Sequence, residues 1–410
     1  MRYVIIGNSA AAVGGVEGIR TVDPDGSITL ISSETHHTYS RPLISYLLYG
    51  KTDLERMKYR PDDFYTENRV KALLGKTATV LDTKKRSVTL DDGGTVTYDR
   101  LLIATGSRPF TPPIAGLDEV ENKFTFMSLD DAAALEKALS RRTRVLIMGA
   151  GLIGLKCAEG IAHLCGHITV ADLADRILPS ILDGEGAALV QKKIEQQGNI
   201  DFILGDSVAS FEKNQATLAS GRTVPFDLLV VAVGVRPNTG LFSAAGGETG
   251  RGIKTDLHCA TSLKNVWAAG DCAESHDVVS DTDRVLALLP NAYMQGRTAG
   301  INMAGGESLY DQAIAMNAMG MFGYHIITAG CYEGEEIVSS DGEAYKKLFV
   351  KDDRLAGYIL IGDVRRAGIY TKLVRERTPL STIDFALIKD KPQLMAFAKK
   401  ERRRQLATRR

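Results

Sequence analysis

RVLIMGAGLIGLKCAEGI, running from Arg144 to Ile161, is the stretch that decides the fold of this chain. Its apolar residues Val145 to Met148 predict a buried β-strand, and the residues after the glycines predict a helix. Between strand and helix stand three glycines in the spacing Gly-x-Gly-x-x-Gly. Gly149 permits a tight turn, Gly151 lets the backbone approach a pyrophosphate, and Gly154 permits close packing of helix on strand.

A helix that opens in this way holds phosphates on its first amides, here those of Leu152 and Ile153. A second apolar run, Ile168 to Ala171, ends in Asp172, at the spacing expected of an acid that accepts hydrogen bonds from a ribose. Such an acid favours NADH because it repels a 2′-phosphate, although the nearby Arg176 opposes that preference. Strand, glycines, helix, strand and acid in this order predict a dinucleotide site rather than an incidental glycine-rich turn.

A less regular version of the pattern opens the chain. The apolar run Tyr3 to Ile6 leads into a turn in which serine and alanine replace the second and third glycines. The small residues that would approach a phosphate are Gly7, Ser9, Ala10, Ala11 and Ala12. The next predicted strand, Ser27 to Ile31, is followed by Ser33 and Glu34, which are placed to meet a ribose. Taken alone, this unit could equally be a structural β-α-β unit.

Three later segments favour nucleotide binding, because each is an apolar run that ends in a turn of small residues. They are Tyr98 to Pro109, with Ala104, Thr105 and Gly106; Val230 to Asn238, with Gly234; and Thr261 to Asp271. Their order predicts a first α/β nucleotide-binding domain interrupted by a second one of similar design.

Composition sets the protein class. A chain of 410 residues, 44% hydrophobic and 24% charged, indicates a soluble globular protein with more than one core. Fifty Lys and Arg residues balance fifty Asp and Glu residues, so charge favours neither nucleic acid nor a membrane surface. No leader-like segment precedes Tyr3 and no apolar stretch has the length of a membrane span. We therefore expect a cytoplasmic protein.

The cysteines predict neither a redox motif nor a metal site. They stand at Cys157, Cys165, Cys259, Cys272 and Cys331, and none forms a Cys-x-x-Cys pair. We expect buried, inert thiols and no bound metal.

These residues together resemble the pyridine-nucleotide-dependent flavoprotein reductases with two dinucleotide-binding domains. Within that group the chain looks most like the NADH:rubredoxin reductases and the flavin domain of assimilatory nitrite reductases, over roughly residues 1 to 380. The resemblance implies non-covalent FAD on the first and third segments and NADH on the second.

The resemblance also implies roles for single residues. Gly7 to Ala12 would hold the FAD pyrophosphate, Glu34 the adenosine ribose, and Asp271 would accept a hydrogen bond from a ribityl hydroxyl. Further FAD positions are Arg41 and Pro42 along the flavin, Thr105 and Gly106 closing over it, and Ala78 and Ala104. The helix opening at Leu289 would point its amides at the flavin N1/C2 carbonyl, where the reduced ring is anionic.

Members of this family often place a lysine–glutamate pair near the flavin N5 atom. The corresponding positions here hold Tyr46 and Lys156. Lys156 is therefore the candidate catalytic residue, with Glu159 one turn further along the helix. Both could equally be ordinary helix-surface residues.

Relatives that reduce disulfides carry a cysteine pair after the first nucleotide unit, and the coenzyme A disulfide reductases and related oxidases and peroxidases carry one. From Ser32 through Glu67 this chain has none. The thiolate does that work, so thiol–disulfide chemistry is not expected. Hydride transfer from NADH to FAD remains, followed by release of single electrons to an iron–sulfur or rubredoxin-type protein, or to a partner subunit of a larger redox complex. The alternatives are an NADH oxidase or peroxidase, and a subunit that holds FAD structurally.

The predicted domains are an FAD-binding domain (1–115 and 253–315), an inserted NADH-binding domain (116–252), a small C-terminal α+β domain (316–385) and a basic extension (386–410). The small domain rests on short β-like runs and a helix expected over Ala367 to Arg375. The basic run Lys399 to Arg410 is either a solvated tail or a docking segment for an acidic electron carrier or a neighbouring subunit.

Overall fold

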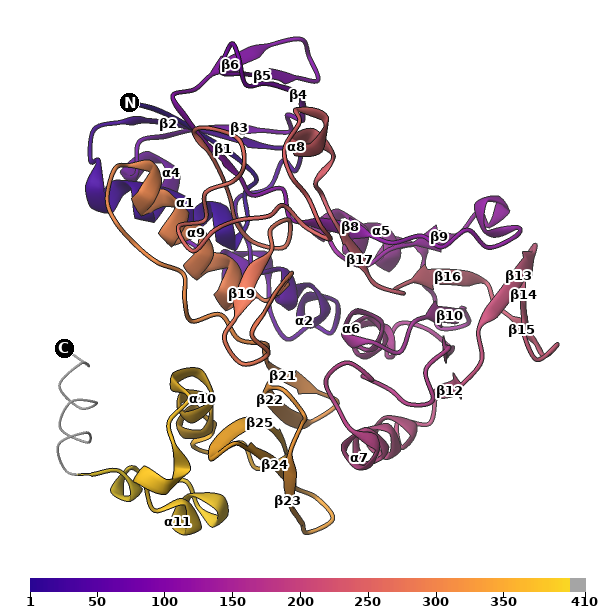
Figure 1. Cartoon of the computed structure of the whole chain (residues 1–410). Helices are drawn as coiled ribbons and strands as arrows, with labels where there is room; N and C mark the ends of the chain where they lie inside the picture. The colour runs from indigo at the N-terminus through magenta and orange to yellow at the C-terminus, as the bar shows by residue number, and fades with distance from the viewer. Residues whose placement is uncertain (399–410) are drawn as a thin grey trace. The chain divides into compact units, whose positions relative to one another are not determined.

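The computed structural model describes residues 1–398, which form two compact units (Figure 1). The first unit comprises Met1–Ile177, Gln197–His276 and Asp283–Asp311. The second comprises Leu178–Gln196, Asp277–Thr282 and the described residues from Gln312 onward. The predicted docking segment, 399–410, lies outside the described residues.

A five-stranded sheet in the order β18-β7-β1-β2-β3 forms one half of the first unit. All of its neighbouring strands run parallel. The strands are β1 (Arg2–Ile6), β2 (Ser27–Ser32), β3 (Val70–Leu74), β7 (Arg100–Ile103) and β18 (Val266–Ala268). Because β18 comes so late in the chain, this sheet is completed only after the chain has left it and returned.

A second parallel sheet, in the order β12-β11-β10-β16-β9, is formed entirely by the residues between β7 and β18. Its strands are β9 (Lys123–Phe124), β10 (Arg144–Met148), β11 (His167–Asp172), β12 (Ile200–Leu204) and β16 (Leu228–Val231). Helices α5 (Leu129–Ala138) and α6 (Leu152–Ile161) belong to the same stretch. The predicted insertion of one Rossmann-like fold within another is therefore confirmed.

Two helices of the first unit, α1 (Ala10–Val22) and α9 (Leu289–Met303), lie side by side (Figure 1). Glycines set their spacing: a Cβ on Gly296 would lie 2.0 Å from the carbonyl oxygen of Ala11, and one on Gly300 would lie 2.3 Å from that of Gly15. Ala11 faces Gly296 and Gly15 faces Gly300, so the helices run parallel. Their N-termini therefore lie at the same end of the sheet.

Smaller elements complete the first unit. Two three-stranded antiparallel sheets are β4 (Ala78–Asp82), β5 (Ser87–Leu90) and β6 (Thr95–Thr97), and β13 (Val208–Glu212), β14 (Gln215–Leu218) and β15 (Thr223–Pro225). The short helices are η1 (Arg41–Leu43), α2 (Ile44–Leu48), α3 (Leu54–Met57), α4 (Phe64–Glu67), η2 (Leu117–Glu119) and α8 (Gly240–Ala244). Strands β8 (Ser107–Pro109) and β17 (Val235–Pro237) pair antiparallel, which joins the segments that follow β7 and β16. Residues of both units contribute to the short strands β19 (Ser275–Asp277) and β20 (Thr282–Arg284), which pair with each other.

The second unit is built on an antiparallel sheet in the order β21-β22-β25-β24-β23. The strands are β21 (Met316–Met321), β22 (Tyr324–Gly330), β23 (Glu335–Ser340), β24 (Tyr345–Lys351) and β25 (Arg354–Ile361). Its helices are α7 (Gly184–Glu195), α10 (Ala367–Glu376), α11 (Phe385–Asp390), η3 (Leu380–Thr382) and η4 (Leu394–Ala396). Helix α10 packs on β22 and β25, and its range agrees with the predicted helix. The predicted small α+β fold is confirmed.

Within residues 1–398, no helix is long and apolar enough to cross a membrane.

Candidate functional site

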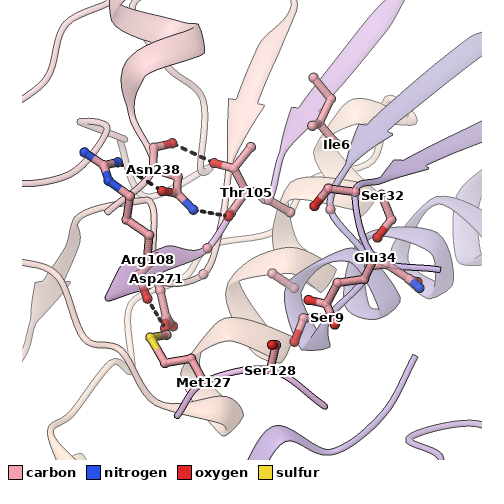
Figure 2. Close-up of a pocket in the computed structure, with 18 of the residues that line it drawn as sticks. Ile6, Ser9, Ser32, Glu34, Thr105, Arg108, Met127, Ser128, Asn238 and Asp271 are labelled. Carbon is pink, nitrogen blue, oxygen red and sulfur yellow. Dashed lines mark hydrogen bonds between the residues drawn. The ribbon is translucent and has the colours of Figure 1, made fainter. Parts of the chain in front are cut away.

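A groove of about 630 Å³ lies in the first unit where β1 ends (Figure 2). That volume is within the usual range for sites that bind small molecules and cofactors. Eleven of the predicted FAD positions line it: Gly7, Ser9, Ala11, Ser33, Glu34, Arg41, Ala78, Ala104, Thr105, Gly106 and Asp271. Four other predicted positions, Ala10, Ala12, Pro42 and Leu289, are not among its lining residues.

The turn between β1 and α1 has the form that a pyrophosphate site requires. Gly7 has a φ of 128°, and a Cβ there would lie 2.0 Å from the carbonyl oxygen of Ala104, so only glycine fits. Ser9 is the N-cap of α1 but makes no capping bond, and Leu288 at the start of α9 has no polar side chain with which to cap. By contrast, Ser128 caps α5. No side chain caps α1 or α9, and the positive ends of these two parallel helices favour an anion, which fits a dinucleotide cofactor.

Glu34 and Arg41, predicted at opposite parts of the cofactor, form an ion pair with each other. Tyr39 donates from its hydroxyl to Glu34 at 2.7 Å, and Arg41 also donates to the Met127 carbonyl at 3.1 Å. Burial opposes the charge of Arg41, but Tyr39 and Glu34 raise its pKa above the ordinary value. The pair therefore places one fixed positive and one fixed negative charge on the groove wall.

Asp271 follows β18, which is one edge strand of the first sheet; β3 is the other edge strand. Burial raises the pKa of its carboxyl group, against the effects of a hydrogen bond from the Ser107 hydroxyl and the charge of Arg41. The Ser107 hydroxyl oxygen lies 3.2 Å from the Asp271 carboxylate. This carboxylate can accept further hydrogen bonds from a polyol within the groove.

Thr105 and Asn238 join the two segments that connect the sheets (Figure 2). The Thr105 hydroxyl donates to the Asn238 carbonyl at 2.7 Å, and the Asn238 amide donates to the Thr105 carbonyl at 2.9 Å. Arg108 donates to the Asn238 side-chain oxygen at 3.1 Å. These reciprocal bonds fix the groove wall at the point where the chain passes from one sheet to the other.

Sequence reasoning did not predict several lining residues, among them Lys76, Ser107, Arg108, Met127, Ser128 and Asn238. Ser128 carried a readable signal, because Ser128-x-x-Asp131 is a capping box at the start of α5. Asn238 carried none, since its partner Thr105 is 133 residues away.

The second glycine loop is equally specific in its geometry. Gly149 has a φ of 110°, and a Cβ there would lie 2.3 Å from the Ala232 carbonyl oxygen. A Cβ on Gly154 would lie 2.0 Å from the Gly149 carbonyl oxygen. A Cβ on Gly151 would meet nothing within 4 Å, and α6 begins there without a side-chain cap. Two glycines are therefore needed for the fold, and the third leaves open space above the amides of Leu152 and Ile153 for a pyrophosphate.

Asp172 lies at the end of β11 beside this loop. Its carboxylate accepts the backbone N–H of Ala150 at 2.6 Å and that of Ala174 at 2.8 Å. A carboxylate has further lone pairs, so ribose hydroxyls can still bind. Arg176, which opposed the prediction of NADH, pairs with Asp175 at 2.8 Å. Gly234, the remaining predicted cofactor-binding position, has a φ of 113° and directly precedes β17.

Lys156 and Glu159 form an ion pair in which the side chains are only 13% and 8% exposed. The Lys156 ammonium also lies 4.2 Å from the centre of the Tyr46 ring. Helices α2 and α6 meet here, because a Cβ on Gly160 would lie 3.0 Å from the Ser45 carbonyl oxygen. The alternative that these are ordinary helix-surface residues is wrong: the pair is enclosed where the two helices pack.

Comparison with known proteins decides the family. Residues 1–296 match the model of the pyridine nucleotide-disulphide oxidoreductases, and residues 316–378 match the rubredoxin NAD⁺ reductase C-terminal domain. The chain belongs to the pyridine nucleotide-disulphide oxidoreductase family. The expected oxidoreductase class and the expected cofactors FAD and NADH are thereby confirmed, and the two loops described above fit them.

Individual relatives and solved structures within the family are also similar to this chain. The chain is 32% identical to the NADH-dependent phenylglyoxylate dehydrogenase subunit epsilon of Aromatoleum evansii, over 93% of each chain. It is 30% identical to the assimilatory nitrate reductase electron transfer subunit of Bacillus subtilis, spanning 92% of this chain but 49% of that one. Among solved structures, the covalent putidaredoxin reductase–putidaredoxin complex matches with a TM-score of 0.87 and 26% identity, over 100% of this chain and 99% of that one.

Despite the family's name, the thiols of this member show no arrangement for disulfide chemistry. None of the five cysteines, all of which lie within the described residues, forms a disulfide, and four of them are buried. Burial raises the pKa of Cys165 to about 11, and it also raises the pKa values of Cys157, Cys259 and Cys272. Thiols with raised pKa values are poor nucleophiles. Within residues 1–398, no group of three or more His, Cys, Asp or Glu side chains is arranged to hold a metal ion.

Proposed function

We propose that this chain oxidises NADH and delivers single electrons to an iron–sulfur or rubredoxin-type protein, either a free carrier or a partner subunit of a larger redox complex. The observation that carries the proposal is a complete groove with no thiol relay. Two helix N-termini and a ribose-type carboxylate converge on it, while the stretch Ser32 to Glu67 has no cysteine. Electrons that enter at the groove then leave it directly.

FAD, when bound, supplies the conversion of a two-electron hydride into single electrons. In this proposal the amides after Gly7 would hold its pyrophosphate, and Glu34 would hold its adenosine ribose through lone pairs that its bonds to Arg41 and Tyr39 leave available. Asp271 holds a ribityl hydroxyl, and the N-terminus of α9 stabilises negative charge on the ring. The Thr105–Asn238 bonds hold the two connecting segments together at the groove wall.

Residues of the second sheet bind the nicotinamide nucleotide in the same proposal. The loop Gly149 to Gly154 holds the pyrophosphate, and Asp172 accepts from the ribose. The ion pair with Asp175 partly offsets the charge of Arg176, which supports a preference for NADH. The domain limits given above, 1–115 with 253–315, 116–252 and 316–385, describe the resulting division of labour.

Lys156 is proposed as the catalytic cation. Its ammonium is held on one side by Glu159 and on the other by the Tyr46 ring, so its position is fixed and its solvation is reduced. Lys156 is not among the residues that line the groove, and its role rests on the family resemblance, which places this position near the flavin N5 atom. A fixed ammonium there would stabilise negative charge that develops during hydride transfer. A cytoplasmic location completes the proposal, because NADH and reduced carriers are available in that compartment.

A turnover assay with alternative acceptors tests the proposal. FAD-loaded protein is mixed with NADH and, in parallel, with a plant-type ferredoxin, a rubredoxin, or oxygen alone. We expect reduction of at least one protein acceptor to exceed oxygen consumption. Faster turnover with oxygen than with either class of carrier would favour the oxidase alternative. Binding of FAD without any NADH turnover would favour the structural subunit.

A further inference from the structure

The helix that connects two strands of the second parallel sheet is packed in the other unit. Strands β11 and β12 belong to the first unit, but Leu178–Gln196, which contains α7, belongs to the second. The chain therefore crosses between units after Ile177 and again after Gln196. The first crossing follows Asp172, the predicted ribose ligand, by only a few residues.

Asp183 anchors this segment in the second unit. Its carboxylate caps α7 by accepting the Gly186 N–H at 3.0 Å, and it also accepts from the Tyr345 hydroxyl at 2.6 Å and the Lys347 ammonium at 2.9 Å. Burial opposes ionisation of Asp183, but the bonds from Tyr345 and Lys347 hold its pKa below the ordinary value. Tyr345 is 3% exposed and Lys347 is 8% exposed, so this is a built contact of β24. Lys347 has a second, exposed partner, Glu336, at 2.7 Å.

The residues just before Asp183 are also held by the second unit, and one of them is strained. The Tyr332 hydroxyl donates to the Ile181 carbonyl at 2.7 Å. Leu178, at the crossing point, is fully buried with a φ of 48°. Its carbonyl accepts from the N–H groups of Ile181 and Leu182 at 3.0 and 2.9 Å. A leucine persists in this left-handed conformation only where its surroundings hold it there.

The other end of the same segment orients the ribose ligand. The Ala174 N–H donates to the Asp172 carboxylate at 2.8 Å and so helps to orient it. Residues 175–182 connect Ala174 to Asp183 along the chain. We propose that the second unit sets the affinity for NADH by holding residues 173–182 through the contacts of Asp183 with Tyr345 and Lys347. This inference rests on the proposed role of Asp172. Asp183, Tyr345 and Lys347 are positioning residues that act on the nucleotide through Asp172.

Two variants and a matched control test the inference in the FAD-loaded protein. Asp183→Asn keeps a good helix cap but removes the charge, and Tyr345→Phe removes one donor. Glu336→Gln removes the exposed partner of Lys347 and leaves the Asp183 contacts in place. In the two test variants we expect the KM for NADH to rise about three- to tenfold at unchanged kcat, because the competent segment conformation is less populated. Glu336→Gln should match the parent.

Hydrogen exchange of residues 173–182, measured without nucleotide, gives a second readout that does not depend on turnover. It should become faster in Asp183→Asn and Tyr345→Phe, and remain at the parent rate in Glu336→Gln. Unchanged exchange over 173–182, or equal losses of kcat, FAD content and NADH affinity, would overturn the inference. Failure of the parent protein to turn over NADH would instead refute the proposed function, and the exchange measurement would still decide whether Asp183 holds the segment.

Discussion

Gly296→Ala places a methyl group between α1 and α9 where the structure has no room for it. The new Cβ would lie 2.0 Å from the carbonyl oxygen of Ala11, 2.7 Å from its carbonyl carbon and 2.8 Å from its Cα. All three are backbone atoms, so no side chain can rotate out of the way. The helices must separate instead, by about 1 Å or more, before the contacts reach ordinary van der Waals distances.

The expected cost follows from two opposing effects. Overpacking of this kind destabilises by about 3 kcal/mol, and replacing glycine by alanine within a helix returns about 1 kcal/mol. The net loss of stability is therefore about 2 kcal/mol. The N-termini of both helices face the groove, so their separation should also weaken FAD binding by about tenfold, or about 1.4 kcal/mol.

Two measurements check this result. Urea unfolding of the apoprotein is followed by the fluorescence of Trp267, the single tryptophan, which lies in β18 of the same sheet. FAD affinity is measured by titration of the apoprotein. Gly368→Ala in α10 is the matched control, because a Cβ there would meet nothing within 4 Å, and circular dichroism should show a small gain in stability. A Gly296→Ala protein as stable and as fully loaded with FAD as the parent would show that the close contact of α1 with α9 is not required.

Three further predictions concern charged groups. Burial raises the pKa of Asp271, so this carboxyl binds a proton more tightly in the folded protein than in the unfolded chain. Stability therefore falls as pH rises from the unfolded-state pKa through the folded-state pKa. Asp271→Asn should stabilise the apoprotein to urea at neutral pH while weakening FAD binding by about 1 kcal/mol. Arg2 lowers the pKa of Asp99 to about 2. This interaction contributes about 1 kcal/mol of folding stability after solvent screening, and the contribution is lost as pH falls from about 4 to 2. Asp99→Asn should abolish this acid dependence in thermal melts. Lys156→Met should cost about 3 kcal/mol because it leaves Glu159 buried without its ion-pair partner. Adding Glu159→Gln should restore stability but leave flavin reduction by NADH about tenfold slow, and a parent-like rate in the double variant would exclude a catalytic role for the cation.

The sequence was sufficient where function requires a local backbone geometry. Gly7 and Gly149 both have positive φ values, and at each a Cβ would lie within 2.3 Å of a backbone oxygen. Only glycine is possible at these positions, so the motif can be recognised in the sequence. The order of the apolar runs also predicted that one sheet is inserted within the other. The run that forms β18 comes after all strands of the second sheet, so it could complete the first sheet only once the chain had left the second. The positive φ values are local backbone requirements, so the glycines are recognisable in the sequence before their distant neighbours, Ala104 and Ala232, are known.

Features that depend on distant partners were not predictable. Asn238 acquires its role only through Thr105, 133 residues away, and Asp183 through Lys347, 164 residues away. The ion pair of Glu34 with Arg41 could not be derived either, because both were assigned to the cofactor separately. Likewise, Lys156 is enclosed because α2 packs against α6, and the sequence pattern of neither helix predicts that packing.

The central claim is that hydride from NADH enters a groove from which electrons leave singly, without a thiol relay. The most direct measurement is an anaerobic double-mixing experiment on the FAD-loaded protein, in which NADH is added first and a ferredoxin or rubredoxin second. NADH should bleach the flavin absorbance and the protein acceptor should restore it, at rates unaffected by alkylation of the thiols. Absence of bleaching, or loss of the second phase after alkylation of the folded protein, would contradict it.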